Sequence, residues 1–217
     1  TVRLIADPEV DIVIELVGGY DVAKRFILAA IAAGKPVVTA NKALLALHGK
    51  EIFAAAGEAG VDVAFEAAVG GGIPILRSLR EGLSANHIDS VLGILNGTTN
   101  YVLTEMERTE EAFEVVLKRA QELGYAEADP GFDVDGVDTA HKLAILASLA
   151  FGCEINFGAV HTEGIRRVSP LEEYAAFVVG QHQHRLHLDD AVGGGARDHL
   201  DDVGVGHVGR RHSQGLR

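Results

Sequence analysis

Apolar and polar positions in the first seventy residues follow two alternating patterns. Short continuous apolar runs, typical of strands buried on both faces of a parallel sheet, occur at residues 11–17, 36–40 and 61–69. Between them, residues 22–33 and 43–56 carry apolar side chains at helical spacing, with glycines beyond each stretch. Strands and helices joined by short loops are typical of βαβ units, which predicts a parallel sheet and an α/β fold.

The pattern changes after Gly70-Gly71-Gly72, where we place a domain junction. Beyond it, apolar spacing predicts helices at residues 73–83, 98–108, 110–123 and 137–151. We expect residues 87–96 to form a longer strand, and the hydroxyl of Thr98 or Thr99 to cap the helix that follows. Residues 1–70 thus form one predicted domain, and residues 71–166 a second one of α+β type.

Residues 167–217 differ from the rest in periodicity and composition. No segment longer than six residues keeps a helical or strand period, and the stretch has eight glycines but neither Lys nor Ile. From Arg166 onward, seven arginines balance seven acidic residues, whereas the whole chain carries a net charge of −12. We expect a disordered tail, with a composition that fits a shifted reading frame in GC-rich DNA.

The overall composition is that of a globular protein and narrows the choice of partners. Apolar residues make up 47% of the chain, yet no apolar run approaches the roughly 18 residues of a membrane span. The net charge of −12 argues against nucleic acid, because phosphate binding requires a basic surface. The single cysteine, Cys153, excludes an internal disulfide and fits a reducing cytoplasm; we expect a buried structural thiol.

Lys142 is the most informative residue for chemistry. It lies in the predicted helix at residues 137–151, which is apolar around most of its circumference and is therefore expected to be buried. Asp138, one turn earlier, lies on the same face and would hold the ammonium group charged and oriented, so that the lysine acts as a proton donor. The alternative is an exposed lysine that pairs with Asp138 for a few tenths of a kcal/mol.

Four acidic residues precede that helix: Glu127, Asp129, Asp133 and Asp135. Asp135 is expected to cap the helix, because carboxylates are favoured at a helix N-terminus. Glu127 lies too far ahead for that role. With Asp138, it is a candidate for binding a substrate ammonium group.

Lys42 directly follows the predicted strand at residues 36–40. Ligands of doubly wound sheets bind beyond the carboxyl ends of the strands, so this lysine is a candidate for contact with a cofactor or substrate. A solvent-facing lysine in the first turn of a helix is the alternative. Asn96-Gly97-Thr98-Thr99 is interpreted as a turn and a helix cap, and His141 is given no role.

Several segments together resemble the homoserine dehydrogenase family, in order and over about residues 5–166. The first are residues 7–15 with Gly18-Gly19, and Val38-Thr39-Ala40-Asn41-Lys42, which are similar to the later strands of that family's nucleotide-binding domain. The next are residues 66–74 and residues 93–101, which resemble its entry into the catalytic domain. The last, residues 124–142, looks like its active-site segment.

The resemblance implies a reaction and a set of site residues. The reaction is reversible hydride transfer between NAD(P)H and aspartate 4-semialdehyde, which gives L-homoserine. Lys142 matches the proton donor to the substrate carbonyl oxygen, and Asp138 and Glu127 match residues at the substrate. Lys42, Asn41 and Gly18 match residues that bind the cofactor, with Lys42 beside the nicotinamide. The remaining matches are Glu66, Val69, Gly71 and Ile73. They match a loop of the family whose backbone oxygens hold a monovalent cation, usually sodium.

The same resemblance sets expectations for the molecule as a whole. It implies a truncated Rossmann-type parallel sheet, followed by an α+β domain for catalysis and dimerisation in a homodimeric, cytoplasmic parent. Ahead of Asp11 we find neither the family's first strand nor its glycine-rich turn, and the chain does not begin with Met. We therefore expect a piece of a longer protein, inactive alone, with an apolar sheet edge exposed near residues 11–17. Another Rossmann-type aldehyde or hydroxy-acid oxidoreductase and a non-enzymatic fragment are the alternatives.

Overall fold

The sheet of this protein is parallel, as the apolar runs predict. The computed structural model describes residues 2–168, so the tail prediction for residues 169–217 lies outside the described residues. The strands are β1 (Val13–Glu15), β2 (Val37–Thr39) and β3 (Val63–Ala64). They lie in the order β1-β2-β3, with Val13 opposite Val37 and Val37 opposite Val63. The predicted α/β fold is confirmed, with strands shorter than the apolar runs.

Helices α2 (Asp21–Ala32) and α3 (Lys42–Ala59) follow β1 and β2 where helical spacing predicts them. A short helix, α1 (Val2–Ile5), precedes β1, where none was predicted. On α2 the buried residues Ala23, Ile27, Ala30 and Ile31 recur one turn apart, so a single face packs inward. Asn41 caps the start of α3 by accepting the backbone N–H of Leu44, and Gly60 ends that helix in the left-handed conformation.

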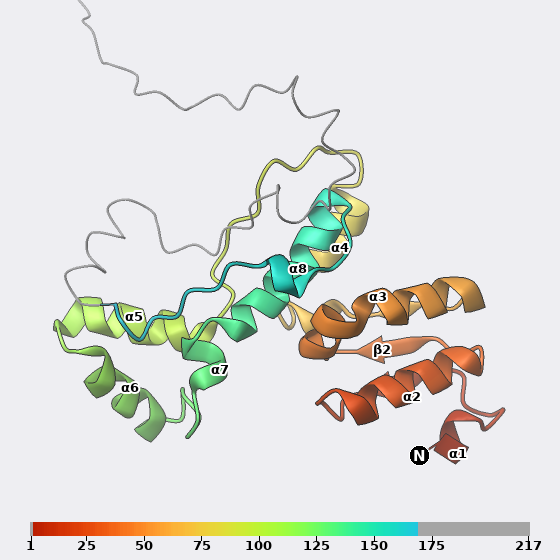
Figure 1. The fold of residues 1–217 in the computed structure, drawn as a ribbon, viewed down its shortest axis with the longest axis horizontal. Coiled ribbons are helices and arrows are strands. Elements are labelled where there is room, and N and C mark those ends of the chain that lie inside the picture. Colours follow the sequence, from red (N-terminus) through yellow and green to blue (C-terminus); the bar gives the residue numbers. More distant parts are fainter. Residues whose placement is uncertain (1, 169–217) are drawn as a thin grey trace, which may run out of the picture.

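The second half is helical in the part of the chain that the structure describes. Its elements are η1 (Glu66–Ala68), α4 (Ile75–Arg77), the π-helix η2 (Ser78–Gly82), α5 (Gly97–Thr109), α6 (Phe113–Glu122), α7 (Gly131–Val134), α8 (Val137–Phe151) and η3 (Phe157–Ala159). Figure 1 shows α5, α6 and α7 at the end of the molecule opposite to α2 and β2. Helix α8 runs between these ends, and its residues match the predicted helix at both boundaries.

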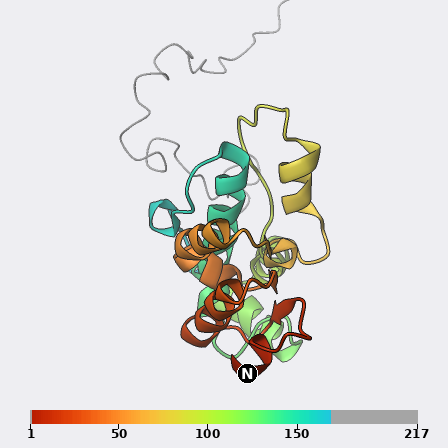
Figure 2. The same ribbon diagram turned by 90° about the vertical axis from the view of Figure 1, so that its right-hand side faces the viewer.

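The predicted strand at residues 87–96 is wrong for the described part of the chain. These residues form an extended connection between η2 and α5, visible in Figures 1 and 2, without strand pairing. Residues 87–95 make no backbone–backbone hydrogen bond among the described residues. Ile88, Val91 and Leu95 pack against the core, whereas Leu92 and Ile94 are 66% and 78% exposed. The inward-facing residues are three and four apart, so the segment lacks the period-two alternation of a half-buried strand, and no neighbouring strand pairs with its backbone within the described residues.

One hydrophobic core joins the sheet to the second half. It combines Ile27 of α2 and Leu44 of α3 with Leu76 and Leu79 beyond the glycine loop, and with Ile145 of α8. Two smaller clusters lie between α5 and α6 and around the middle of α8. The shared core fixes the start of α3 relative to α8, and the candidate site lies where these helices approach each other.

Within residues 2–168, β1 is an edge strand with an exposed apolar flank. Ile12, Ile14, Leu16 and Val17 are each more than half exposed. Sequence reasoning expected this edge, because residues 11–17 are apolar enough for burial on both faces. No helix in the same range is long and apolar enough to cross a membrane.

Candidate active site

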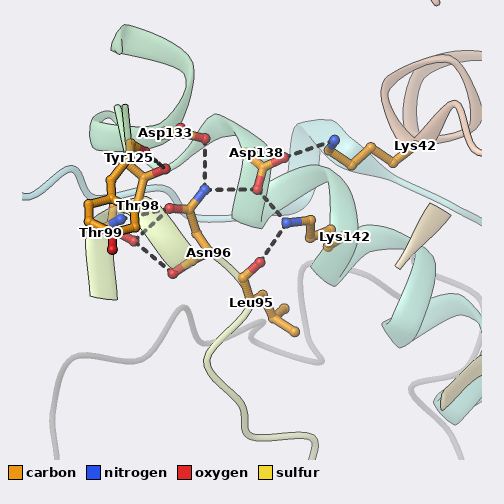
Figure 3. Close-up of polar contacts among 9 residues, drawn as sticks. All are labelled: Lys42, Leu95, Asn96, Thr98, Thr99, Tyr125, Asp133, Asp138 and Lys142. Carbon is orange, nitrogen blue, oxygen red and sulfur yellow. Dashed lines mark hydrogen bonds and ion pairs between the residues drawn. The ribbon is translucent and has the colours of Figure 1, made fainter. Parts of the chain in front are cut away.

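A buried carboxylate, Asp138, lies between two lysines from different halves of the chain (Figure 3). Its Oδ1 is 3.1 Å from Nζ of Lys42, the first residue of α3. Its Oδ2 is 2.5 Å from Nζ of Lys142, one turn later on α8. The predicted partnership of Asp138 with Lys142 is confirmed as a contact, and the structure adds Lys42 to it.

The environment of Asp138 favours its charged form. The residue is only 5% exposed, and burial alone raises the pKa of a carboxyl. Hydrogen bonds from Lys142 and Asn96, and the charges of Lys142 and Lys42, outweigh that effect and lower the pKa of Asp138 below its ordinary value. The carboxylate therefore stays ionised and keeps both ammonium groups oriented.

Lys142 is held by two acceptors and keeps one donor free for a ligand. Its Nζ donates to Oδ2 of Asp138 and to the backbone carbonyl of Leu95, each at 2.5 Å. An ammonium group has three N–H bonds, so one remains available in the described part of the chain. The side chain is 17% exposed, which excludes the alternative of a solvent-facing surface lysine.

The carboxyl ends of β1 and β2 bring Lys42, Asn41 and Gly18 together. Lys42 and Asn41 follow β2, and the side-chain amide of Asn41 donates to the carbonyl of Gly19 at 2.8 Å. Gly18 and Gly19 have φ of +75° and +70°, and a Cβ on either would meet nothing within 4 Å. The backbone here is open for close approach by a ligand.

Glu15 organises this edge, and sequence reasoning did not single it out. Its carboxylate is 2% exposed at the end of β1. Oε1 accepts the backbone N–H groups of Val17 and Gly18, and Oε2 accepts the hydroxyl of Thr39 on β2. A glutamate at the end of an otherwise apolar run is the signal that would have identified it.

The turn and cap interpreted at residues 96–99 is confirmed, but the expected capping residues of α5 and α8 are wrong. Asn96, not Thr98 or Thr99, caps α5, because its side-chain oxygen accepts the backbone N–H of Thr99 at 2.8 Å. Asp135 does not cap α8, whose N-cap is Gly136 with φ of +81°. The carboxylate of Asp135 instead pairs with the guanidinium of Arg166 at 2.5 Å, which lowers the pKa of Asp135.

Glu127 stays apart from the cluster around Asp138. Its side chain is exposed and makes no hydrogen bond or ion pair within residues 2–168. Only its backbone carbonyl is engaged, by the amide of Gln121 at 3.0 Å. Its assignment to the substrate remains a prediction.

The loop at residues 66–73 is held by the carboxylate of Glu66. The two oxygens accept the backbone N–H groups of Leu76 and Arg77, each at 2.9 Å, and so anchor the start of α4. Gly70 and Gly71 take positive φ of +79° and +59°, which this turn requires. Within the described ranges, no three His, Cys, Asp or Glu side chains gather in a way that could hold a metal ion.

His141 lies beside the site without entering it, whereas Cys153 is half-buried beyond the other end of α8. The ring of His141 packs between Phe132 and Phe157, with centroids 5.3 and 4.5 Å away, and its Nδ1 has no partner among the described residues. Burial lowers the pKa of this histidine. Burial raises the pKa of the Cys153 thiol, in keeping with the expected structural role.

Comparisons with protein families agree with the geometry of the site. The family model described as "Homoserine dehydrogenase, NAD binding domain" matches residues 2–66, and the model "Homoserine dehydrogenase" matches residues 74–191. The second match extends past Arg166, where the resemblance found in the sequence ended. Both models favour this family over other Rossmann-type oxidoreductases.

Individual relatives give the same result. The homoserine dehydrogenase of Pseudomonas aeruginosa is 56% identical over 174 residues, which are 80% of this chain and 40% of the relative. That of Bacillus subtilis is 50% identical over 76% of this chain and 38% of its own length. The chain therefore spans about two fifths of the length of the curated relatives it matches.

Solved structures extend the likeness to three dimensions. The crystal structure of a homoserine dehydrogenase from Thiobacillus denitrificans matches with a TM-score of 0.78 at 55% identity, over 81% of this chain and 41% of that one. A hyperthermophilic archaeal homoserine dehydrogenase in complex with NADPH matches with a TM-score of 0.69 at 29% identity, over 77% and 51%.

Proposed function

The chain belongs to the homoserine dehydrogenase family, and from that premise we propose that it carries the proton-transfer part of that family's active site. The proposed reaction is the reversible NAD(P)-dependent reduction of L-aspartate 4-semialdehyde to L-homoserine. The observation that carries this proposal is the contact of Lys142 with both Asp138 and the carbonyl of Leu95, which leaves one N–H of the lysine free.

Lys142 is the proposed proton donor. Its ammonium group donates to the aldehyde oxygen of the substrate and protonates the alkoxide that develops there; in the reverse direction the amine accepts the same proton. General acid catalysis of this kind contributes about 10²–10⁴-fold to the rate. Asp138 keeps Lys142 charged and aimed before transfer, because its buried carboxylate accepts directly from Nζ.

The dinucleotide fits the carboxyl edge of β1 and β2. Gly18 provides open backbone, Asn41 fixes the adjacent loop through Gly19, and Lys42 lies between this edge and Asp138. When bound, the nicotinamide would supply the hydride. The NADPH complex of the archaeal relative supports a nicotinamide dinucleotide as the cofactor.

We assign the substrate amino group to Glu127, assisted by Asp138. The exposed carboxylate of Glu127 has no competing partner within residues 2–168, so it is free to pair with an ammonium group. Glu127→Ala should raise KM for homoserine about tenfold with a smaller effect on kcat, because such a pair contributes to ground and transition states alike. Glu122→Ala, which removes an exposed carboxylate on α6, is the matched control, and an unchanged KM in Glu127→Ala would reject the assignment.

The loop at residues 66–73 is the proposed site of a monovalent cation such as sodium. Its ligands would be the backbone oxygens of Glu66, Val69, Gly71 and Ile73. Those of Val69 and Gly71 accept no backbone hydrogen bond among the described residues, and those of Glu66 and Ile73 accept one each. A carbonyl oxygen has two lone pairs, so all four retain capacity for a hard cation. We also propose that the full-length parent protein is a homodimer in the cytoplasm.

The proposal is tested with a completed protein, in which residues 2–168 replace the aligned segment of the Pseudomonas aeruginosa relative. The reduction of NADP or NAD is followed with L-homoserine and, as controls, with other hydroxy acids of similar size. We expect turnover that depends on L-homoserine. Equal turnover with the other hydroxy acids, or cofactor binding without any turnover, would overturn the proposed function.

A further inference from the structure

Asn96 is a buried amide that connects three elements at the site. It lies at the start of α5, is 6% exposed, and faces α7 and α8 (Figure 3). Its Nδ2 donates to Oδ1 of Asp133 at 2.7 Å and to Oδ2 of Asp138 at 2.9 Å. Both N–H bonds of one side-chain amide are therefore used on two carboxylates.

The orientation of this amide is fixed by the helix that it caps. Oδ1 of Asn96 accepts the backbone N–H of Thr99 at 2.8 Å and the hydroxyl of the same residue at 3.0 Å. A backbone N–H can only donate, so the oxygen must face α5 and the nitrogen must face Asp133 and Asp138. The cap and the contact with the carboxylates are two separate roles of one side chain.

Asn96 is one of three side chains that donate to the carboxylate of Asp138. Lys42 holds Oδ1, whereas Oδ2 accepts from both Lys142 and Asn96. Asp133 and Asp138 bind the same nitrogen, so they lie close enough to repel each other. Donation from the amide to both offsets that repulsion. Without it, the repulsion from Asp133 favours a shift of the Asp138 carboxylate against the hold of the two lysines.

We propose that Asn96 is a positioning residue, whose amide holds the carboxylate of Asp138 in the orientation that aims Lys142 at the substrate oxygen. The expected effect on kcat rests on the proposed function, whereas the expected effect on the Asp138 carboxyl does not. Asn96 touches neither substrate nor cofactor in this account. It acts through Asp138, and the structural signature of that action is the charge state of the Asp138 carboxyl.

Two substitutions separate positioning from capping. Asn96→Ser keeps an oxygen that can cap α5 but removes both N–H donors, so the contacts with Asp133 and Asp138 are lost. Thr99→Val removes only the hydroxyl that supports the oxygen of Asn96 and leaves both donors in place. The first readout is the pKa of Asp138 in the 217-residue chain, from the carboxyl carbon resonance during a pH titration, with Asp138→Asn to assign it.

We expect Asn96→Ser to raise the pKa of Asp138 and Thr99→Val to leave it as in the wild type. In the completed protein, Asn96→Ser should lower kcat about tenfold or more with little change in KM, because the hydrogen bond that orients the Asp138 carboxylate is lost. A pKa of Asp138 that stays unchanged in Asn96→Ser overturns the proposal, whether or not the completed protein turns over. An unchanged kcat in a completed protein that oxidises homoserine overturns it as well. Absence of turnover in the completed wild type contradicts only the proposed function.

Discussion

Asp138 holds a negative charge between two ammonium groups, in a place where solvent reaches little of it. A buried carboxylate without partners would be costly, and a buried lysine without partners equally so. Burial of the Asp138 carboxylate and of its lysine partners is therefore tolerated only because they pair with each other. The contact also fixes the ammonium group of Lys142, the proposed proton donor, before a substrate arrives.

Removal of Lys142 should affect the chemical step rather than cofactor binding. In the completed protein, Lys142→Ala is expected to lower kcat at least about 100-fold and to leave the affinity for NADPH nearly unchanged. Lys118→Ala, at an exposed position of α6, is the control and should behave as the wild type. If Lys142→Ala kept more than about a third of the wild-type kcat, Lys142 would not be the proton donor.

His141 should make the stability of the chain depend on pH. Burial lowers its pKa in the folded state, the charge of Asp138 opposes this effect, and the charge of Lys42 adds to it. A histidine with a depressed folded pKa stabilises the fold fully above its unfolded pKa of about 6.5. That contribution is lost as pH falls from about 6.5 through the folded pKa, because the unfolded state binds the proton more tightly.

The melting temperature between pH 8 and pH 5 measures this contribution. We expect the melting temperature of the wild type to decrease more steeply below about pH 6.5 than that of His141→Phe, because phenylalanine cannot take up the proton. His161→Phe, at an exposed position, should follow the wild-type curve. Parallel curves for the wild type and His141→Phe would show that burial of this ring has no effect on its titration.

At the scale of helices and strands, the sequence predicted the elements and contacts that depend only on residues close together in the chain. Helix α8 has the predicted bounds, because its apolar spacing is continuous and Gly152 ends it in the left-handed conformation. The approach of Asp138 to Lys142 follows from their spacing of one turn. Lys42 was selected by its place after β2, but its contact with Asp138 depends on how α3 packs against α8, which no local pattern contains.

Other features of the site depend on partners far away in the sequence. Asn96 was interpreted only as part of a turn and cap, because its contacts with Asp133 and Asp138 lie 37 and 42 residues away. Asp135 was assigned to a cap because Arg166, the partner that it binds, is 31 residues away. Residues 87–96 are apolar enough to suggest a strand, yet apolar content says nothing about whether a neighbouring strand is present to pair with them.

The segment that carries Arg166 is attached to the junction of α7 and α8. The backbone N–H of Ile165 donates to the carbonyl of Val134 at 2.8 Å. A Cβ on Gly164 would lie 2.7 Å from that carbonyl oxygen and 2.9 Å from Cα of Asp135. Backbone atoms cannot rotate away from such a contact, so Gly164→Ala must displace the segment.

Gly164→Ala is expected to lower the free energy of unfolding by about 1–3 kcal/mol, as overpacking does in other proteins. The matched control is Gly158→Ala, whose Cβ would come no closer than 3.5 Å to a side-chain atom. Urea unfolding of both variants provides the measurement. Equal midpoints for Gly164→Ala and the wild type would show that residues 164–166 are not attached as described.

At the scale of the whole molecule, the described chain brings the proposed catalytic groups together but leaves one flank of its sheet open. Lys42, Asp138 and Lys142 are in contact, and the core that positions them runs from α2 to α8. The edge at β1 exposes Ile12, Ile14, Leu16 and Val17, and within residues 2–168 no further strand pairs with it. Dinucleotide pyrophosphate is bound by backbone N–H groups at a helix N-terminus after such a strand.

Lys42, Asp138 and Lys142 are the proposed centre of a homoserine dehydrogenase site, and the chain spans about two fifths of the length of its curated relatives. We therefore predict that the cofactor side of this site requires residues beyond these 217. The most direct test measures NADPH binding and homoserine-dependent turnover, side by side, for the 217-residue chain and the completed protein. We predict tight NADPH binding and turnover for the completed protein, and neither at an appreciable level for the chain alone. Comparable turnover in the two would contradict the claim that the cofactor side is incomplete, and a completed protein that binds NADPH without oxidising homoserine would contradict the claimed site.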